Sequence, residues 1–158
     1  MLLLLGCCLW IGWNVPYTHD DWDWGQPAGL EWWLSGSMNN RYTGSFFVVL
    51  MTRSPLIKTL VIGGCLFFLP LLAALTVQPQ GRRTHWFPLT MLGCAVLMSI
   101  PIISWRQTYG WVSACANFVV AGLWLLVLIL LVQAGTAADY RGWGIPALLF
   151  PLTLAGQL

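Results

Sequence analysis

The chain has 158 residues, of which 58% are hydrophobic and 8% are charged, and its formal net charge is +2. This composition lies far outside that of soluble globular domains and predicts an all-α integral membrane protein. The few basic residues are dispersed, which argues against a nucleic-acid-binding surface. The five cysteines lie inside apolar runs, so neither a disulfide framework nor a cysteine metal site is expected.

The apolar runs predict a single transmembrane domain, a polytopic bundle of four or five spans. A helix needs about 20 apolar residues to cross a hydrocarbon core of about 30 Å. The predicted spans are residues 1–17, 57–77, 86–104, 112–133 and 145–158. The first is short, but it lacks the positive n-region and cleavage site of a signal peptide, so we expect it to be retained. The last run is also short, which predicts either that the chain is the N-terminal part of a longer protein or that partners complete this helix.

Residues 18–56 are expected to form an outer loop that carries one or two surface helices. Pro16 ends the first span, so the acidic stretch after it is expected to be an exposed loop. Residues 28–39 have an apolar and a polar side, which is typical of a helix lying in the membrane interface. Residues 42–52 are apolar but too short to span, and they predict a second surface or half-inserted helix. The competing interpretation makes 42–52 part of a crossing and inverts the topology of everything after it.

Arg82 and Arg83 predict the orientation, because basic residues in short loops are retained on the cytoplasmic side. Alternation of the spans then puts residues 18–56 on the non-cytoplasmic side. Arg53 and Lys58 count against this assignment, since they fall on the outer side. Their weight is smaller if they belong to a segment lying on the membrane surface.

Asp20 and Asp21 are the strongest candidates for chemistry, because four of the five acidic residues fall between positions 20 and 31. Paired carboxylates can hold a hard divalent cation, or they can divide the roles of base and anion. The alternative is a solvated acidic loop that only enforces topology. His19 precedes the pair and is a candidate base or ligand, because imidazole serves in both roles in proteins, although a hydrogen-bonding neighbour is the simpler interpretation.

Arg41 and Arg106 fall on the same predicted side as the acidic pair. Guanidinium groups bind phosphate with bidentate geometry, so these arginines and the carboxylates could frame a phosphorylated lipid head group. Snorkelling near helix ends is the alternative. Residues 105–111, which include Trp105 and Tyr109, are polar and aromatic in a way that suits stacking against a sugar. An interfacial aromatic belt explains them equally well.

Three short motifs carry a resemblance to a known family. They are His19-Asp20-Asp21-Trp22, Trp33 with Asn39-Asn40-Arg41, and the segment from Trp105 to Trp111. The layout resembles the membrane-embedded C-type glycosyltransferases, and more closely an uncharacterised bacterial branch of glucosyltransferase-like polytopic proteins. The chain departs from the pattern of that branch by having Asn40 where glycine usually precedes the arginine.

The resemblance implies transfer of a sugar from a polyprenyl-phosphate donor on the non-cytoplasmic face of a bacterial inner membrane. It implies that Asp20 or Asp21 deprotonates the acceptor hydroxyl or helps to bind a divalent cation, and that the arginines hold the lipid phosphate. The alternative is a non-catalytic transmembrane subunit that packs in a larger membrane complex. A transporter is disfavoured, because no charged residue lies near the middle of a predicted span.

Overall fold

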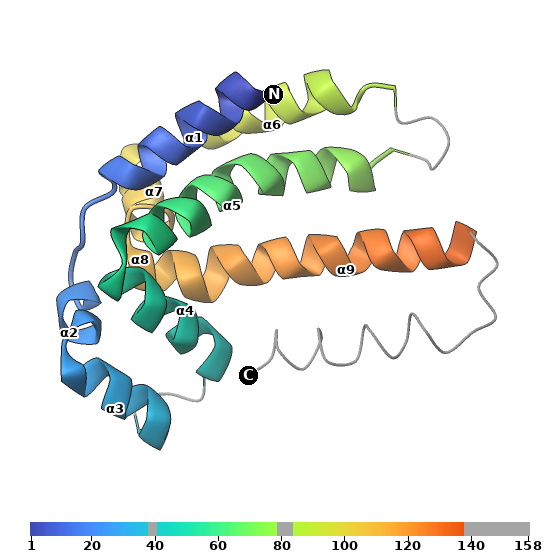
Figure 1. Ribbon diagram of the computed structural model, residues 1–158. Helices are drawn as coiled ribbons and strands as arrows, with labels where there is room; N and C mark the ends of the chain where they lie inside the picture. Colours follow the sequence, from blue (N-terminus) through green and yellow to red (C-terminus); the bar gives the residue numbers. More distant parts are fainter. Residues whose placement is uncertain (38–40, 79–83, 138–158) are drawn as a thin grey trace.

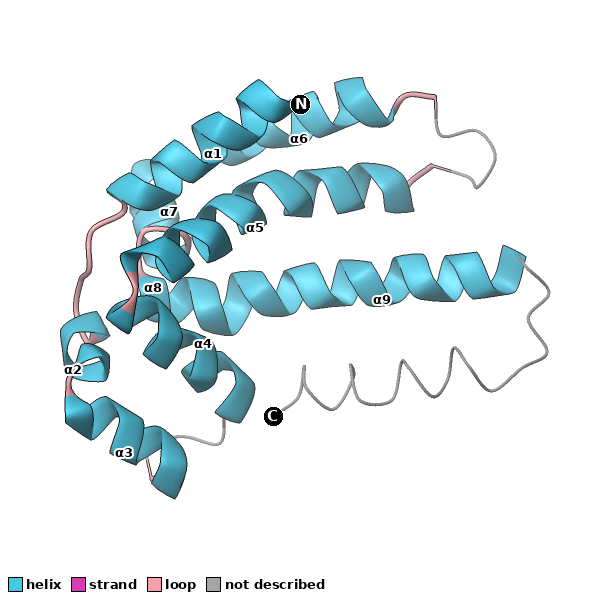
Figure 2. Cartoon of the chain, in the orientation of Figure 1, coloured by secondary structure: helices cyan, strands magenta, loops and turns pink. Residues whose placement is uncertain are grey.

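The computed structural model describes residues 1–37, 41–78 and 84–137. Every regular element within these ranges is a helix (Figure 2). The predicted all-α fold class is therefore confirmed for the described part of the chain. The fifth predicted span, residues 145–158, lies outside it, as do Asn39, Asn40, Arg82 and Arg83.

The helices fall into a longer and a shorter group. The longer helices are α1 (Leu2–Asn14), α5 (Pro55–Thr76), α6 (Trp86–Met98) and α9 (Val120–Ala137). The shorter ones are α2 (Asp21–Gly25), α3 (Pro27–Ser35), α4 (Tyr42–Arg53), α7 (Ile102–Thr108), α8 (Val112–Ala114) and the π-helical segment η1 (Cys115–Val119). The segments α8, η1 and α9 follow one another without a break, so they form one continuous helical rod.

The longer helices lie side by side and alternate in direction along the chain (Figure 1). Helix α5 occupies the middle and contacts α1, α6 and α9. The short helices α2, α3 and α4 gather where α1 ends and α5 begins, and α7 and α8 lie at this same end of the bundle (Figure 1). We call it the α2 end. The end of α5 and the start of α6 lie at the opposite end, so the acidic stretch and the segment that follows α6 meet at the α2 end.

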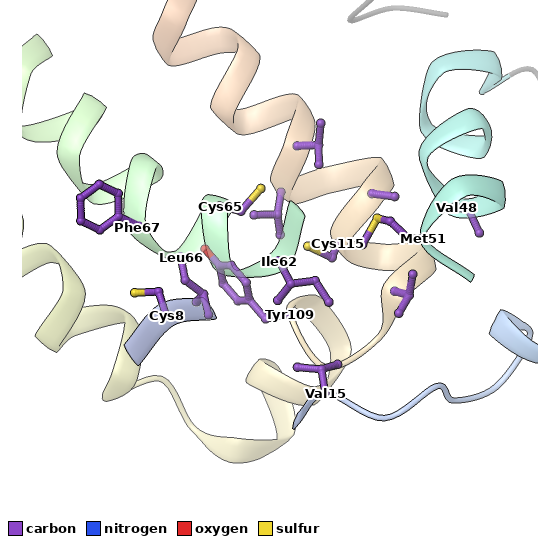
Figure 3. Packing of buried hydrophobic residues seen from close by; sticks show 14 of the residues in the cluster. Cys8, Val15, Val48, Met51, Ile62, Cys65, Leu66, Phe67, Tyr109 and Cys115 are labelled. Carbon is purple, nitrogen blue, oxygen red and sulfur yellow. The ribbon is translucent and has the colours of Figure 1, made fainter. Parts of the chain in front are cut away.

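The best-buried part of the core lies between α4, α5 and the start of the rod (Figure 3). Met51 from α4, Ile62 and Leu66 from α5, and Cys115 from η1 are each fully buried. Tyr109 is also buried here, directly after α7. Removing these apolar side chains from solvent is the main favourable contribution to packing at this place. It fixes α4 and the rod against the first half of α5.

Helices α1 and α5 cross with their backbones in near contact, because glycine occupies both sides of the crossing. A Cβ atom added to Gly12 would lie 2.8 Å from the backbone nitrogen of Gly63. A Cβ atom added to Gly63 would lie 2.7 Å from the Cα atom of Leu9 and 2.8 Å from the carbonyl oxygen of Cys8. Small residues allow this close approach between helices in membranes.

Gly63→Ala should therefore weaken the α1–α5 crossing, because the added methyl group meets backbone atoms that cannot move independently. We expect a loss of about 1–3 kcal/mol in the free energy of unfolding, which is usual for overpacking. The matched control is Gly64→Ala, since a Cβ there meets only a side-chain carbon of Phe68 at 3.8 Å. Thermal unfolding in detergent checks the pair, and equal midpoints for the two variants would contradict the crossing.

Two helices are long and apolar enough to cross a membrane. They are α5, residues Pro55–Thr76, and the part of the rod from Val112 to Gly135. These correspond to the predicted spans 57–77 and 112–133. The number rises to three if the bent pair of α6 and α7 forms one span. Two or three such helices agree with an integral membrane protein.

The predicted third span, residues 86–104, corresponds to two helices and not to one continuous helix. Helix α6 ends at Met98, and α7 begins at Ile102 after a bend of 102°. Pro101 explains the break, because it has no N–H to donate and it disfavours helical backbone at the residue before it. The predicted first span, residues 1–17, is likewise shorter than expected. Helix α1 has 13 residues, about 20 Å of length against a core of about 30 Å.

The two helices predicted between the first spans are present. Helix α3 covers most of the predicted 28–39. It ends at Ser35 and is followed by Gly36 in the left-handed conformation, with φ of 65°. Helix α4 covers the predicted 42–52 and ends at Arg53. Ser54 is extended, and its hydroxyl accepts a hydrogen bond from the N–H of Ile57, so it starts α5 as a separate helix. This break favours the interpretation in which 42–52 is a helix distinct from the following span.

Candidate functional site

The acidic stretch folds differently from the exposed loop that we expected. The N–H of Asp21 bonds to the carbonyl oxygen of Thr18, His19 has φ of 52°, and Asp21 begins the short helix α2. Trp24 and Asp21 form the buried side of this helix, with only 5% and 1% of their surfaces exposed. Burial of an indole against the core, which local sequence does not reveal, explains why a helix forms there.

The carboxylate of Asp21 joins α2 to the start of the rod. Its Oδ1 accepts hydrogen bonds from the N–H and the hydroxyl of Ser113, at 3.0 and 3.1 Å. Its Oδ2 accepts from the N–H of Thr18 at 2.9 Å and of Val112 at 3.3 Å. The N–H groups at a helix start have no partner within the helix, so Asp21 caps the rod from 91 residues away. A carboxylate accepts about four hydrogen bonds, so Asp21 has no open position left.

Burial raises the pKa of the Asp21 carboxyl above its ordinary value, and the hydrogen bonds from Thr18, Ser113 and Val112 oppose this shift. The same mechanism acts on the neighbouring phenol. Burial raises the pKa of Tyr17, and the charge of Asp21 raises it further. The hydroxyl of Tyr17 donates to the carbonyl oxygen of Met51 at 3.0 Å, so it is a further link between this segment and α4.

The carboxylate of Asp20 is held by two indole rings and is less enclosed. The Nε1–H of Trp111 donates to Oδ1 at 2.7 Å, and the Nε1–H of Trp24 donates to Oδ2 at 3.2 Å. The side chain is half-buried. Each oxygen of Asp20 therefore accepts one hydrogen bond and keeps room for a second. The two neighbouring aspartates therefore differ in whether their oxygens have open acceptor positions, which a base or a metal ligand needs.

Arg53 and Lys58 cap helix ends near the acidic pair. The Arg53 guanidinium donates to the carbonyl oxygens of Trp24 at 2.9 Å and of Gln26 at 2.5 Å, at the end of α2. The buried Lys58 ammonium donates to the carbonyl oxygens of Trp13 and Val15, at the end of α1, and lies 4.8 Å from the centre of the Tyr17 ring. Cations stabilise the carbonyl end of a helix. These contacts give a local reason for two basic residues that count against the predicted orientation.

The aromatic candidates divide between surface and core. Trp105 is half-buried and stacks on Tyr109, with ring centres 6.1 Å apart, but Tyr109 itself is 4% exposed and belongs to the core. His19 is exposed, and its ring meets the Trp111 ring edge to face at 5.3 Å. His19 thus lies beside the indole that holds Asp20, whereas Tyr109 faces the interior with Cys65 and Leu66 (Figure 3).

The two candidate arginines lie on different elements at the α2 end. The guanidinium of Arg41 lies 5.3 Å from the centre of the Phe118 ring on η1, a cation–π contact. Arg106 lies in the last turn of α7, is exposed, and makes no hydrogen bond or ion pair with the residues that the structure describes. Phe118 lies six residues after Val112, so Arg41 contacts the rod about 9 Å along its axis from a residue that binds Asp21. No described contact joins Arg106 to the carboxylates.

The carboxylates were also candidate ligands for a divalent cation. Across residues 1–37, 41–78 and 84–137, no group of three or more His, Cys, Asp or Glu side chains gathers in a geometry that could hold a metal ion. Hard divalent cations take six or more oxygen ligands, and the oxygens of Asp21 are already filled by donors. The described residues therefore form no cluster of three protein ligands at this place, and of the two aspartates only Asp20 keeps open acceptor positions.

Sequence reasoning missed the residues that hold the acidic pair in position. Trp111 entered only as part of an aromatic segment, and Ser113 and Trp24 were not singled out. The available signal was the start of the longest apolar run, which has free N–H groups and no acidic residue of its own in the first turn. A buried helix start needs an acceptor, but only the fold shows that Asp21 supplies it.

Comparisons of the chain with protein-family models, with curated proteins and with solved structures find no match.

Proposed function

We propose that this chain is a glycosyltransferase-like membrane protein that takes a sugar from a polyprenyl-phosphate donor, with Asp20 as its base. In this proposal it has four or five spans and resides in a bacterial inner membrane, with the α2 end on the non-cytoplasmic face. The proposal rests on the resemblance of the His19–Trp22, Asn39–Arg41 and Trp105–Trp111 motifs. It is refined by the contacts of the acidic pair.

The observation that carries the assignment is the difference between the two aspartates. Asp20 is half-buried and accepts one hydrogen bond on each oxygen. Asp21 is 1% exposed and accepts four. A general base must have a free lone pair within hydrogen-bonding reach of the proton that it takes. This requirement supports Asp20 as the base and Asp21 as the residue that fixes the position of Asp20.

The proposed step is a single displacement at the anomeric carbon of the donor. The acceptor hydroxyl oxygen attacks that carbon and its proton passes to the Asp20 carboxylate, while the bond from the anomeric carbon to the phosphate oxygen breaks. The electron pair of that bond leaves with the polyprenyl phosphate. Indole N–H groups on both oxygens of Asp20 hold the carboxylate in one orientation, and such positioning is a main source of rate enhancement.

The departing phosphate needs cationic partners, and we propose Arg106 and Arg41 for this role. Arg106 is exposed at the end of α7, with no hydrogen bond or ion pair to other described residues. Arg41 directly precedes α4 and packs on Phe118. Guanidinium groups bind phosphate oxygens in pairs. Trp105 and His19, at the same end, are the proposed contacts for the sugar.

Membranes that contain the chain should transfer radiolabelled sugar from a polyprenyl-phosphate donor to lipid or polymer acceptors. The same sugar supplied as a nucleoside diphosphate should be inert when polyprenyl phosphate is absent. Membranes from cells lacking the chain are the control. Equal transfer in both membranes, with a panel of polyprenyl-linked hexoses, would remove the proposal.

A second candidate function is a non-catalytic transmembrane subunit. The observation that favours it is the filled carboxylate of Asp21, together with large apolar side chains exposed on α1 and α6, among them Leu2, Leu3, Leu92 and Val96. Lipid covers such surfaces as readily as a partner does. If the chain is such a subunit, purification in mild detergent should recover one partner protein at a fixed ratio. The isolated chain should then lose its defined elution profile in gel filtration. Elution of the chain alone as a stable species would contradict it.

A further inference from the structure

We propose that Trp111 is a positioning residue for the Asp20 carboxylate, so that the start of the rod sets the geometry of the reacting group. This inference rests on the proposed function. The Nε1–H of Trp111 makes the shorter of the two hydrogen bonds to Asp20, 2.7 Å against 3.2 Å for Trp24. Trp24 belongs to α2, the short helix that begins at Asp21, directly after Asp20. Trp111 is the donor that comes from outside it.

Trp111 is itself fixed in place. It directly precedes α8, and its carbonyl oxygen accepts the N–H of Cys115 at 2.9 Å, the first hydrogen bond of the rod. The edge of the His19 ring lies against its ring. The next two residues, Val112 and Ser113, bind Asp21. Three consecutive residues, Trp111 just before the rod and Val112 and Ser113 at its start, therefore hold two consecutive carboxylates, and a shift of either partner moves both aspartates together.

A base gains rate from being held within a fraction of an ångström of its working position, and a misplacement of about 1 Å can cost 10²-fold. The hydrogen bond from Trp111 restrains one oxygen of Asp20 and leaves the second lone pair of that oxygen open. Trp111 touches neither sugar nor phosphate in this role. Its loss should lower the turnover of bound substrate more than it weakens substrate binding.

The test compares Trp111→Phe with Trp111→His. Phenylalanine keeps an aromatic ring and loses the N–H. In histidine the Nε2 atom occupies the place of the indole Nε1 on the five-membered ring, so a donor is kept. For sugar transfer we expect Trp111→Phe to lower kcat about 10- to 100-fold with KM changed less than about threefold. Trp111→His should be at least about fivefold faster than Trp111→Phe. Trp10→Phe is the control, because Trp10 is 69% exposed on α1.

A second readout does not depend on activity. A water-soluble carbodiimide with an amine nucleophile converts accessible carboxyl groups to amides, and peptide fragmentation by mass spectrometry distinguishes Asp20 from Asp23. We expect amide formation at Asp20 to become at least about threefold faster in Trp111→Phe, because one oxygen loses its restraint, and to be unchanged at Asp23. Variants are compared per folded molecule after gel filtration in detergent.

The outcomes separate the positioning role of Trp111 from the proposed sugar transfer. Faster labelling of Asp20 with an unchanged kcat overturns the positioning role and leaves the proposed function intact. Unchanged labelling overturns the hydrogen bond itself. A wild-type protein that transfers no sugar removes the proposed function and the positioning role with it, whatever the labelling shows. A fall in kcat together with faster labelling, and recovery of both by histidine, is the result that the structure predicts.

Discussion

Asp21→Asn should destabilise the α2 end more than the same substitution at Asp20. Asparagine keeps the shape of aspartate but replaces one oxygen by an NH₂ group, which donates and does not accept. Both oxygens of Asp21 accept from a backbone N–H, from Ser113 on one side and from Thr18 and Val112 on the other. Whichever way the amide turns, at least one buried N–H faces another donor.

We expect Asp21→Asn to lower the free energy of unfolding by about 2–4 kcal/mol, because an unsatisfied buried donor costs about 1–3 kcal/mol and the cap of the rod is weakened as well. Thermal unfolding in detergent measures the loss. Asp23→Asn is the matched control, since Asp23 lies on the exposed side of α2 and its carboxylate has no hydrogen-bond partner among the described residues. A difference below about 0.5 kcal/mol between the two variants would contradict the capping role.

Asp20→Asn should have the opposite effect, with little loss of stability and a large loss of sugar transfer. The side chain is half-buried and its two partners are indole N–H groups, so water can replace a lost contact at the rim and the stability should change by less than about 1 kcal/mol. An amide is not a base, so the proposed transfer should fall about 10²- to 10⁴-fold. Initial rates with a radiolabelled polyprenyl-phosphate sugar measure this loss.

The control for this second variant is again Asp23→Asn, which alters charge at the same helix without altering the proposed base. It should keep the wild-type rate within about twofold, because Asp23 is exposed and its carboxylate makes no hydrogen bond with the other described residues. If Asp20→Asn retains the wild-type rate in folded protein, the base is a different group.

Local sequence was sufficient to predict the helices that depend on apolar runs and on capping or helix-breaking residues. The apolar runs around residues 57–77 and 112–133 correspond to helices long enough to cross a membrane, and Ser54 with Pro55 separates α4 from α5. Pro101 was visible in the sequence as well. A proline inside an apolar run is compatible both with a mild kink and with the 102° bend that the structure has, so the run alone does not predict the bend.

The arrangement of the candidate site depends on contacts between distant residues, which no local pattern contains. The sequence marks Asp20 and Asp21 as the strongest candidates for chemistry, but it treats them as equivalent neighbours. Their difference arises from residues 111–113, 91 positions later. In the sequence, Lys58 is only a basic residue that counts against the predicted orientation. Its contacts with the end of α1 appear once the helices are packed.

The division of roles between the two carboxylates is tested most directly by the rate of sugar transfer per folded molecule in Asp20→Asn and Asp21→Asn. The rates are measured at low temperature on preparations whose folded fraction is determined at the same time. We expect Asp20→Asn to be folded and inactive. Asp21→Asn is less stable, yet at least about tenfold more active per folded molecule than Asp20→Asn. Transfer that survives in Asp20→Asn and is lost in folded Asp21→Asn would contradict the division of roles between the two carboxylates.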